Sequence, residues 1–230
     1  MKIQGFQKLT LLDYPGKTAA TIFTGGCNFR CPFCHNSDLV LNPAAFPEIA
    51  EEEVLSQLRR RAGFIDGVCI TGGEPLLTDI SGLIKKIKEL GLLVKVDTNG
   101  SFPIRLNALL LSGDVDYVAM DIKNSPEKYA ETVGVAGFDT SSIKKSVEIL
   151  KSSGVDHEFR TTVVKELHTE ADMESIGQWL EGDSRYFLQS YKLSDGVIDK
   201  TLTPHNTEDL KKLLETVKKY LPNAQIRGVE

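Results

Sequence analysis

Three cysteines within eight residues form the segment of the sequence best suited to chemistry. Cys27, Cys31 and Cys34 follow the pattern C-x3-C-x2-C, in a loop that begins with Gly25 and Gly26 directly after a predicted strand. An iron–sulfur cluster that a protein holds completely takes four thiolates. Three thiolates leave one iron without a protein ligand, and an open metal position is where a substrate binds. The spacing therefore predicts a 4Fe–4S cluster with one open iron.

Zinc is the competing interpretation of the same loop. Structural zinc sites usually combine paired C-x2-C units, and here a second pair is missing. Ligation by Cys34 together with the adjacent His35 is conceivable but sterically awkward. The fourth cysteine, Cys69, lies inside an apolar predicted strand, and free cysteine is among the most buried residue types. We therefore favour iron and sulfur over zinc, and we expect Cys69 to be a core residue.

The elements that position this loop are short apolar strands separated by amphipathic helices. Strands are predicted at Thr18–Phe23, Gly67–Thr71, Leu92–Thr98, Tyr117–Asp121, Glu158–Val164 and Tyr186–Gln189. Their near-continuous apolar character is typical of parallel strands covered on both faces. Helices are predicted around Val54–Leu58, Ile80–Leu90, Ile143–Leu150, Met173–Leu180 and Leu210–Tyr220, the last two with Thr169 and Thr207 as N-caps.

The alternation of strand and helix, repeated about six times, implies βαβ units with right-handed crossovers. Periodicity leaves open whether the sheet is doubly wound or curls like a barrel. Parallel α/β sheets of either kind place their sites at the carboxyl ends of the strands. Polar or glycine residues at those ends are Gly72, Gly73, Glu74, Asp97, Thr98, Asn99, Asp121, Lys123, Arg160 and Gln189.

The overall composition narrows the class of protein. The 230-residue chain has 27 basic and 32 acidic residues, and its net charge of −5 argues against non-specific nucleic-acid binding. No apolar run approaches the roughly 20 residues of a membrane span, and the first residues lack the apolar core of a signal peptide. We therefore expect a cytoplasmic protein that binds neither nucleic acid nor membrane, with its clustered cysteines serving metal or redox chemistry.

The order of these motifs resembles that of the radical S-adenosylmethionine (SAM) superfamily. The cysteine loop has Phe33 directly before its last cysteine, and the sequence TGGEP at Thr71–Pro75 resembles the superfamily's GGEP motif. The segments Asp97–Gly100 and Asp121–Lys123 follow in the same order as in that superfamily. The resemblance extends over nearly the whole chain, so it bears on the fold as well as on the site.

Two further features are similar to the glycyl-radical-enzyme activases within that superfamily: the opening Gln7–Lys17 and the triplet Cys34-His35-Asn36. The resemblance implies an α/β fold, a partial (β/α)6 TIM-like barrel, in a single domain over residues 1–230. Residues 1–17 would be an N-terminal extension, 18–205 the partial barrel, and 206–230 a C-terminal helix and tail.

The resemblance also implies the cofactors. Cys27, Cys31 and Cys34 would hold a 4Fe–4S cluster whose open iron is chelated by the amino and carboxylate groups of SAM. Reductive cleavage would give methionine and a 5′-deoxyadenosyl radical, which abstracts a hydrogen atom. The residues expected to bind SAM or to surround it are Phe33, His35, Asn36, Gly72, Gly73, Glu74, Asp97, Thr98, Asn99, Asp121, Lys123, Arg160 and Gln189.

Individual roles follow from the same resemblance. Phe33 is expected beside the adenine and Glu74 beside the methionine ammonium, because an ionised carboxylate only accepts hydrogen bonds. Lys123 and Arg160 are expected near the methionine carboxylate. The long connection Asn124–Phe138 is expected to contact the substrate protein. The remaining histidines are expected to be ordinary surface or loop residues: His157, His168 and His205.

The leading hypothesis is therefore an activase that generates a glycyl radical on a large partner enzyme. The resemblance favours anaerobic ribonucleoside-triphosphate reductase as the partner and a protein such as flavodoxin or ferredoxin as the electron donor, with a monomeric free chain. A radical SAM enzyme acting on a small molecule is one alternative. The other is a non-catalytic, metal-stabilised binding module, which would bind zinc and show no affinity for SAM.

Overall fold

The computed structural model describes residues 2–183 and 185–229, which form an eight-stranded sheet with the strands side by side in chain order. The strands are β1 (Ile3–Thr10), β2 (Ala19–Thr24), β3 (Gly67–Gly72), β4 (Leu93–Thr98), β5 (Tyr117–Asp121), β6 (Asp156–Val163), β7 (Tyr186–Ser190) and β8 (Gln225–Arg227). β1 is antiparallel to β2, and every later neighbouring pair is parallel.

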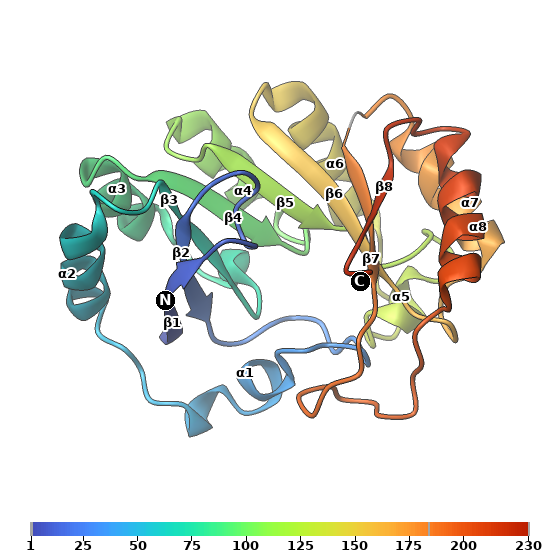
Figure 1. The fold of residues 1–230 in the computed structure, drawn as a ribbon, viewed down its shortest axis with the longest axis horizontal. Helices are drawn as coiled ribbons and strands as arrows, with labels where there is room; N and C mark the ends of the chain where they lie inside the picture. The colour runs from blue at the N-terminus through green and yellow to red at the C-terminus, as the bar shows by residue number, and fades with distance from the viewer. Residues whose placement is uncertain (1, 184, 230) are drawn as a thin grey trace.

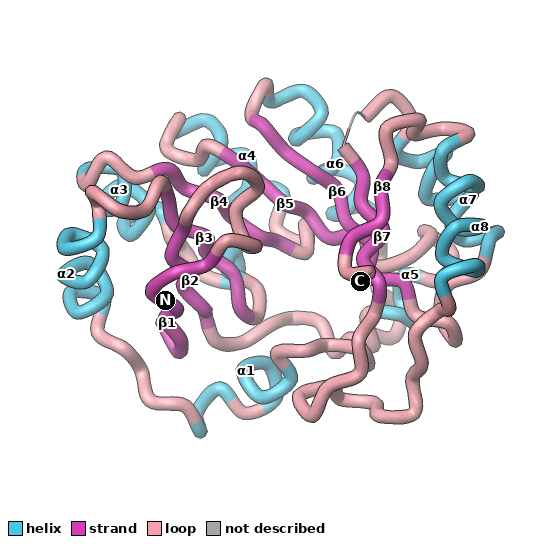
Figure 2. The backbone as a smooth tube through the Cα atoms, viewed as in Figure 1, coloured by secondary structure: helices cyan, strands magenta, loops and turns pink. Residues whose placement is uncertain are grey.

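The sheet curls without closing. Figures 1 and 2 show helices around its outer side, with β1 and β8 on opposite sides of an opening. No pairing joins β8 to β1 among the described residues. The parallel strands β2 to β7 are the six strands predicted from the sequence, each within two residues at either end. The predicted partial barrel is therefore confirmed, and the sheet is not the open, doubly wound alternative.

The helices are α1 (Ser37–Leu41), α2 (Glu51–Arg61), α3 (Ser81–Glu89), α4 (Pro103–Ser112), α5 (Tyr129–Thr132), α6 (Ser141–Ser153), α7 (Glu170–Leu180) and α8 (Thr207–Lys218). The predicted cap of α7 is confirmed, because Thr169 and Asp172 form a capping box. The predicted cap of α8 was wrong by one residue: the Asn206 side chain accepts from the Asp209 N–H, and Thr207 is the first helical residue. None of the helices in the described residues is long and apolar enough to cross a membrane.

The two faces of the sheet differ in character. Val68 and Val94 are neighbours in register, and both are fully buried in the main apolar core. The residues that follow them, Cys69 and Lys95, are also neighbours in register and therefore lie on the opposite face, since side chains alternate along a strand. That inner face is buried too, but it carries polar and charged side chains. The curl of the sheet thus gathers polar groups from separate strands on its concave side.

Candidate functional site

The cysteine loop leaves β2 after Thr24 and is held against the turn that follows β3. The Gly73 N–H donates to the Thr24 carbonyl at 2.9 Å, and the Glu74 N–H donates to the Gly26 carbonyl at 2.8 Å. This approach requires glycine on the β3 side. A Cβ on Gly73 would lie 1.9 Å from the Gly26 carbonyl oxygen, and Gly72 has a φ of +116°, which favours glycine. Gly72 and Gly73 therefore allow the turn after β3 to pack directly against the cysteine loop.

Replacing Gly73 with alanine is expected to push these loops apart. The clash is with backbone and has no flexible side chain to yield, so we expect a loss of about 1–3 kcal/mol in unfolding free energy and poorer retention of iron. Gly82→Ala is the matched control, because a Cβ there meets nothing within 4 Å. Denaturant unfolding and iron analysis check both variants. Equal behaviour of the two variants would show that the close approach has no importance.

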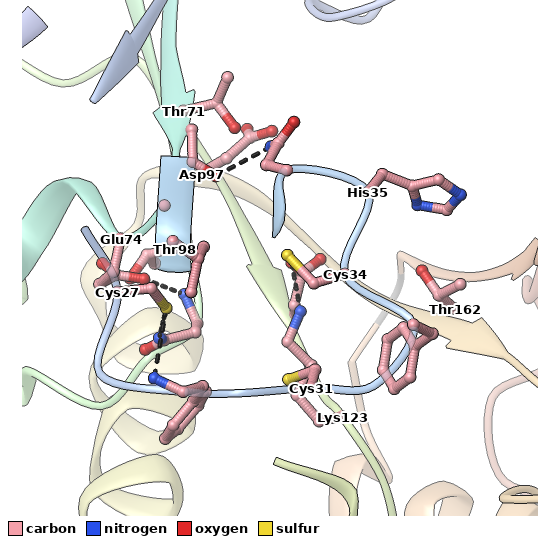
Figure 3. A pocket seen from close by; sticks show the side chains of 18 of the residues that line it. Cys27, Cys31, Cys34, His35, Thr71, Glu74, Asp97, Thr98, Lys123 and Thr162 are labelled. Carbon is pink, nitrogen blue, oxygen red and sulfur yellow. Dashed lines mark hydrogen bonds and ion pairs between the residues drawn. The ribbon is translucent and has the colours of Figure 1, made fainter. Parts of the chain in front are cut away.

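The three thiols of the loop line one cavity, and none of them forms a disulfide. Figure 3 shows Cys27, Cys31 and Cys34 on a loop that curves around a common space, with His35 directed away from it. Burial raises the pKa of the Cys27 thiol to about 11 and that of Cys31 to about 12. Buried thiolates need positive charge nearby, and the irons of a cluster supply it. Three thiols on one loop that line the same cavity suit a cluster that leaves one iron open.

The structure brings every predicted site residue to this single cavity, at the carboxyl ends of the strands. Its lining includes Cys27, Cys31, Phe33, Cys34, His35, Asn36, Gly72, Gly73, Glu74, Asp97, Thr98, Asn99, Asp121, Lys123, Arg160 and Gln189. Sequence reasoning did not single out four other lining residues: Phe29, Val40, Thr71 and Thr162. The apolar Phe29 and Val40 belong to the loop and to α1, and no chemical signal distinguishes them in the sequence.

Glu74 fastens the end of β3 to the end of β4. Its side chain is 1% exposed, and Oε1 accepts from the Leu76 N–H at 2.9 Å and the Thr98 hydroxyl at 2.7 Å. Oε2 accepts from the Asn99 N–H at 2.7 Å. Burial nevertheless raises its pKa to about 7. A carboxylate has about four acceptor positions, so the side chain retains about one for a ligand. The predicted contact of Glu74 with the methionine ammonium therefore has about one acceptor position available.

Charged side chains on, or just after, three strands form one alternating row that extends from the cavity into the concave face of the sheet. It is here called the charged row: Lys95, Asp97, Arg160, Asp121 and Lys123. Arg160 donates to Asp97 Oδ2 at 3.2 Å through Nη1 and to Asp121 Oδ1 at 3.0 Å through Nε. Lys123 Nζ lies 2.9 Å from Asp121 Oδ2, and Lys95 Nζ bonds Asp97 Oδ1. Three cations and two carboxylates give the row a net charge of +1.

The charged row sets the ionisation of its acids. Burial alone would raise the pKa of Asp121, but Arg160 and Lys123 lower it to about 2. Arg160 and Lys95 likewise overcome burial and lower the pKa of Asp97. Both acids therefore stay ionised, and the surplus positive charge suits an anionic ligand. Sequence reasoning missed Lys95, although a lysine inside the apolar strand Leu93–Thr98 was a usable signal.

Amide side chains connect the cysteine loop to the strand ends. Asn99 Nδ2 donates to Asn28 Oδ1 at 3.0 Å and lies 3.7 Å from Cys27 Sγ, while the Phe29 N–H lies 3.4 Å from the same sulfur. Hydrogen bonds to a ligating sulfur tune the potential of a cluster. Asn36 Nδ2 donates to the Gly72 carbonyl at 2.9 Å. Asn36 thereby ties the loop to the end of β3.

The far side of the cavity is formed from β6, β7 and the last part of the cysteine loop. The Thr162 hydroxyl lies 3.5 Å from Gln189 Oε1, at the end of hydrogen-bonding range. His35 is exposed, and its Nε2 lies 2.7 Å from the Lys192 carbonyl oxygen, just beyond β7. Phe33 is buried and packs edge-on against His168, with 6.3 Å between the ring centroids. The contacts of His35 and Phe33 join the cysteine loop to the segments that follow β7 and β6.

His168 lies in the loop before α7, as expected, but it is not at the surface. Its side chain is 1% exposed, Nδ1 accepts from the Val164 N–H at 3.0 Å, and Nε2 donates to the Lys123 carbonyl at 2.8 Å. This pattern requires the neutral imidazole, and burial lowers its pKa. His168 therefore fixes the backbone of Lys123 and the ring of Phe33. His157 is not in a loop either: it is the second residue of β6, and its Nε2 lies 2.9 Å from Asp183 Oδ2.

This burial predicts a specific pH dependence of stability. The folded pKa of His168 lies below the ordinary value of 6.5, so the unfolded state binds more protons as the pH falls through 6.5. The wild type should lose about 1 kcal/mol more stability than His168→Gln between pH 7 and pH 5. Denaturant unfolding of the cluster-free proteins measures the difference, in which the His157 contribution cancels. Parallel pH profiles would contradict the assignment.

The connection Asn124–Phe138 backs the cysteine loop. Tyr129 and Val133 are fully buried, and the Val133 carbonyl accepts from the Arg30 N–H at 2.8 Å. Gly134 lies close to Arg30 as well: a Cβ there would stand 2.6 Å from the Arg30 carbonyl oxygen. The buried middle of this segment therefore supports the cysteine loop, and its contact with a substrate protein stays a prediction.

Comparisons with known proteins agree with this geometry. The model of the Radical SAM superfamily matches residues 21–180. A Methanocaldococcus jannaschii protein with the assigned name glycyl-radical enzyme activating enzyme is 33% identical, over 99% of this chain and 96% of that protein. The pyruvate formate-lyase-activating enzyme of Clostridium pasteurianum is 32% identical, over 60% of each chain. The M. jannaschii protein thus matches this chain over nearly the full length of both.

A solved structure supports the fold. The crystal structure of Streptococcus suis SuiB bound to S-adenosylmethionine superposes with a TM-score of 0.69 at 18% identity, covering 90% of this chain and 49% of that chain. At this identity the likeness concerns the fold alone. Together with the family match, the findings establish the cofactors, because the superfamily uses a 4Fe–4S cluster and SAM. The chain belongs to the radical SAM superfamily and, within it, to the glycyl-radical enzyme activating enzymes.

Proposed function

We propose that this chain activates a glycyl-radical enzyme by removing a hydrogen atom from a glycine of that partner. The observation that carries the proposal is the cavity, in which three thiols on one loop face a charged surface suited to an amino acid. The full-length similarity to the M. jannaschii protein supports the choice of activity. When bound, the cluster and SAM supply the reductive cleavage that gives methionine and the 5′-deoxyadenosyl radical.

The protein's own contribution begins at the methionine end of SAM. Cys27, Cys31 and Cys34 hold the cluster. Lys123 and Arg160 present the positive end of the charged row to the methionine carboxylate. The backbone at Gly72 and Gly73, with the remaining acceptor position of Glu74, faces the ammonium group. These residues would hold the amino acid end of SAM in place, and orientation is what the protein adds to the cofactor's chemistry.

The adenosine end lies along the opposite side of the cavity. Phe33 provides an apolar surface for the adenine, and His168 holds its ring. Thr98, Asn99 and Gln189 offer hydrogen bonds to the ribose and base edges. Asp97, Asp121, His35 and Asn36 act mainly through neighbours: the acids hold Arg160, and the other two fix the cysteine loop.

The proposed partner is anaerobic ribonucleoside-triphosphate reductase, and the proposed electron donor is a flavodoxin or ferredoxin. Both choices rest on the overall similarity of the sequence to the activating proteins of that reductase. The free chain is proposed to be a monomer that docks transiently. A radical enzyme acting on a small molecule predicts the same cavity, so the experiment must follow the hydrogen atom itself.

The test uses anaerobically reconstituted protein with dithionite, SAM and a partner labelled with deuterium at the glycine α-carbon. Activation predicts a glycine-centred EPR doublet and one deuterium in 5′-deoxyadenosine. A partner with alanine at the target glycine is the control and should give neither signal. Formation of 5′-deoxyadenosine without deuterium, with every candidate glycyl-radical enzyme, would contradict the proposal and favour a small substrate.

A further inference from the structure

Lys95 lies beneath the candidate site, at the inner end of the charged row. It occupies the middle of β4 with Val94 and Val96 on either side, and it is 1% exposed. Because side chains alternate along a strand, Lys95 shares the concave face with Asp97. Lys95 is not among the residues that line the cavity. It therefore acts on a ligand only through its neighbours.

The contacts of Lys95 Nζ are made with two side chains. One is Asp97 Oδ1, and the other is Cys69 Sγ at 3.6 Å. The Cys69 thiol in turn lies 3.7 Å from Asp97 Oδ1 and donates to it. Burial raises the pKa of Cys69, so its thiol is neutral and Asp97 is the counter-charge of Lys95. A buried ammonium without a partner is strongly disfavoured, which makes this pairing a built feature of the site.

Asp97 consequently has two cations, one on each oxygen. Lys95, on the same strand as Asp97, pairs with Oδ1, and Arg160, on β6, pairs with Oδ2. Without Lys95, Oδ1 would keep only the weak thiol donor, and the carboxylate would be free to turn. The net charge of the charged row would also fall from +1 to 0, since two cations and two carboxylates would remain. Both changes would reach Arg160 and the ligand side of the cavity.

We propose that Lys95 is a positioning residue, a built-in counter-cation that fixes the Asp97 carboxylate and supplies the surplus positive charge that holds the carboxylate of SAM. This inference rests on the proposed function, because it assumes that an amino acid moiety binds beside Arg160 and Lys123. It predicts that the wild type needs no small cation from solution at Asp97. It also predicts that a variant with a short side chain at position 95 regains SAM binding when a small cation is added.

The test is SAM binding by calorimetry to the cluster-loaded, oxidised protein, which binds without turnover. In tetramethylammonium chloride, Lys95→Ala is expected to bind SAM about tenfold more weakly than the wild type. Replacing tetramethylammonium with ammonium or methylammonium should restore most of that loss, because the removed side chain leaves room for the small cation. The wild type should bind equally in all three salts. Lys95→Met, which fills the space without charge, should bind weakly in every salt.

The outcomes separate a charge role from a purely structural one. If Lys95→Ala binds SAM as tightly as the wild type, the inference is overturned. It is also overturned if ammonium restores SAM binding to Lys95→Ala and Lys95→Met equally, or restores it to neither variant. If wild-type protein with a full cluster fails to bind SAM, the proposed function fails. The counter-cation role is then decided by cluster-free protein, where ammonium should raise the Tm of Lys95→Ala alone. Equal shifts for the wild type and both variants would overturn it.

Discussion

Replacing Cys31 with alanine is expected to abolish cluster binding, whereas replacing Cys69 with alanine is expected to preserve it. Cys31 is one of three thiols on the loop, and two thiolates do not hold a cubane cluster. After anaerobic reconstitution, Cys31→Ala should fall from about four iron atoms per chain to near zero. Iron and acid-labile sulfide analysis, with the absorbance of the cluster, measure the loss. Formation of 5′-deoxyadenosine should disappear with it.

Cys69→Ala is a matched control because it removes another buried thiol. Cys69 lies on β3, fully buried as predicted, and its sulfur contacts Lys95 and Asp97 within the charged row. Its loss leaves the direct pairing of Lys95 with Asp97 in place, so iron should stay at the wild-type level. Equal loss of iron in the two variants would mean that the assignment of the three ligands is wrong.

Replacing Arg160 with methionine is expected to destabilise the cluster-free protein by about 3–5 kcal/mol. Arg160 is 13% exposed and bridges Asp97 and Asp121, so its removal leaves two half-buried carboxylates that each keep one lysine partner. Denaturant unfolding at neutral pH measures the change. Lys86→Met is the control: its ion pair with Glu51 is largely exposed, and its loss should cost at most about 1 kcal/mol.

The pH dependence of the Arg160 variant gives a second check. In the wild type, the pKa of Asp121 is lowered from 3.8 to about 2, so this stabilisation is present above pH 4 and is lost as the pH falls toward 2. In Arg160→Met only the part of that stabilisation that comes from Lys123 remains. The stability gap between the two proteins should therefore narrow as the pH falls from about 4 to about 2. A constant gap would mean that Arg160 contributes through packing and not through charge.

The six parallel strands and the position of the site were predictable because both depend on local pattern. An apolar run bounded by polar residues identifies a parallel strand, and its carboxyl end is where polar residues gather. The edges of the sheet were not predictable in this way. β1 mixes polar and apolar residues and is defined by antiparallel pairing with β2, while the three residues of β8 depend on pairing with β7.

Within the site, residue types were more predictable than partners. The sequence indicated Glu74 and a ligand role, but its three internal donors come from the turn after β3 and from the end of β4. The roles of Lys95 and His168 become clear only from their contacts in the folded structure. Lys95 pairs with Asp97, and His168 bonds the Lys123 carbonyl. Burial of a charged or titratable side chain depends on tertiary neighbours. Local sequence therefore identifies the candidates but not their tasks.

The central claim is that three thiolates leave one iron open for the amino and carboxylate groups of SAM. Electron–nuclear double resonance on the reduced, cluster-loaded protein tests it directly, with SAM carrying 15N in the amino group and 17O in the carboxylate. The account predicts couplings from both labels to the cluster, and their loss when SAM is replaced by unlabelled material. A full cluster without either coupling, or zinc at the three cysteines, would contradict it.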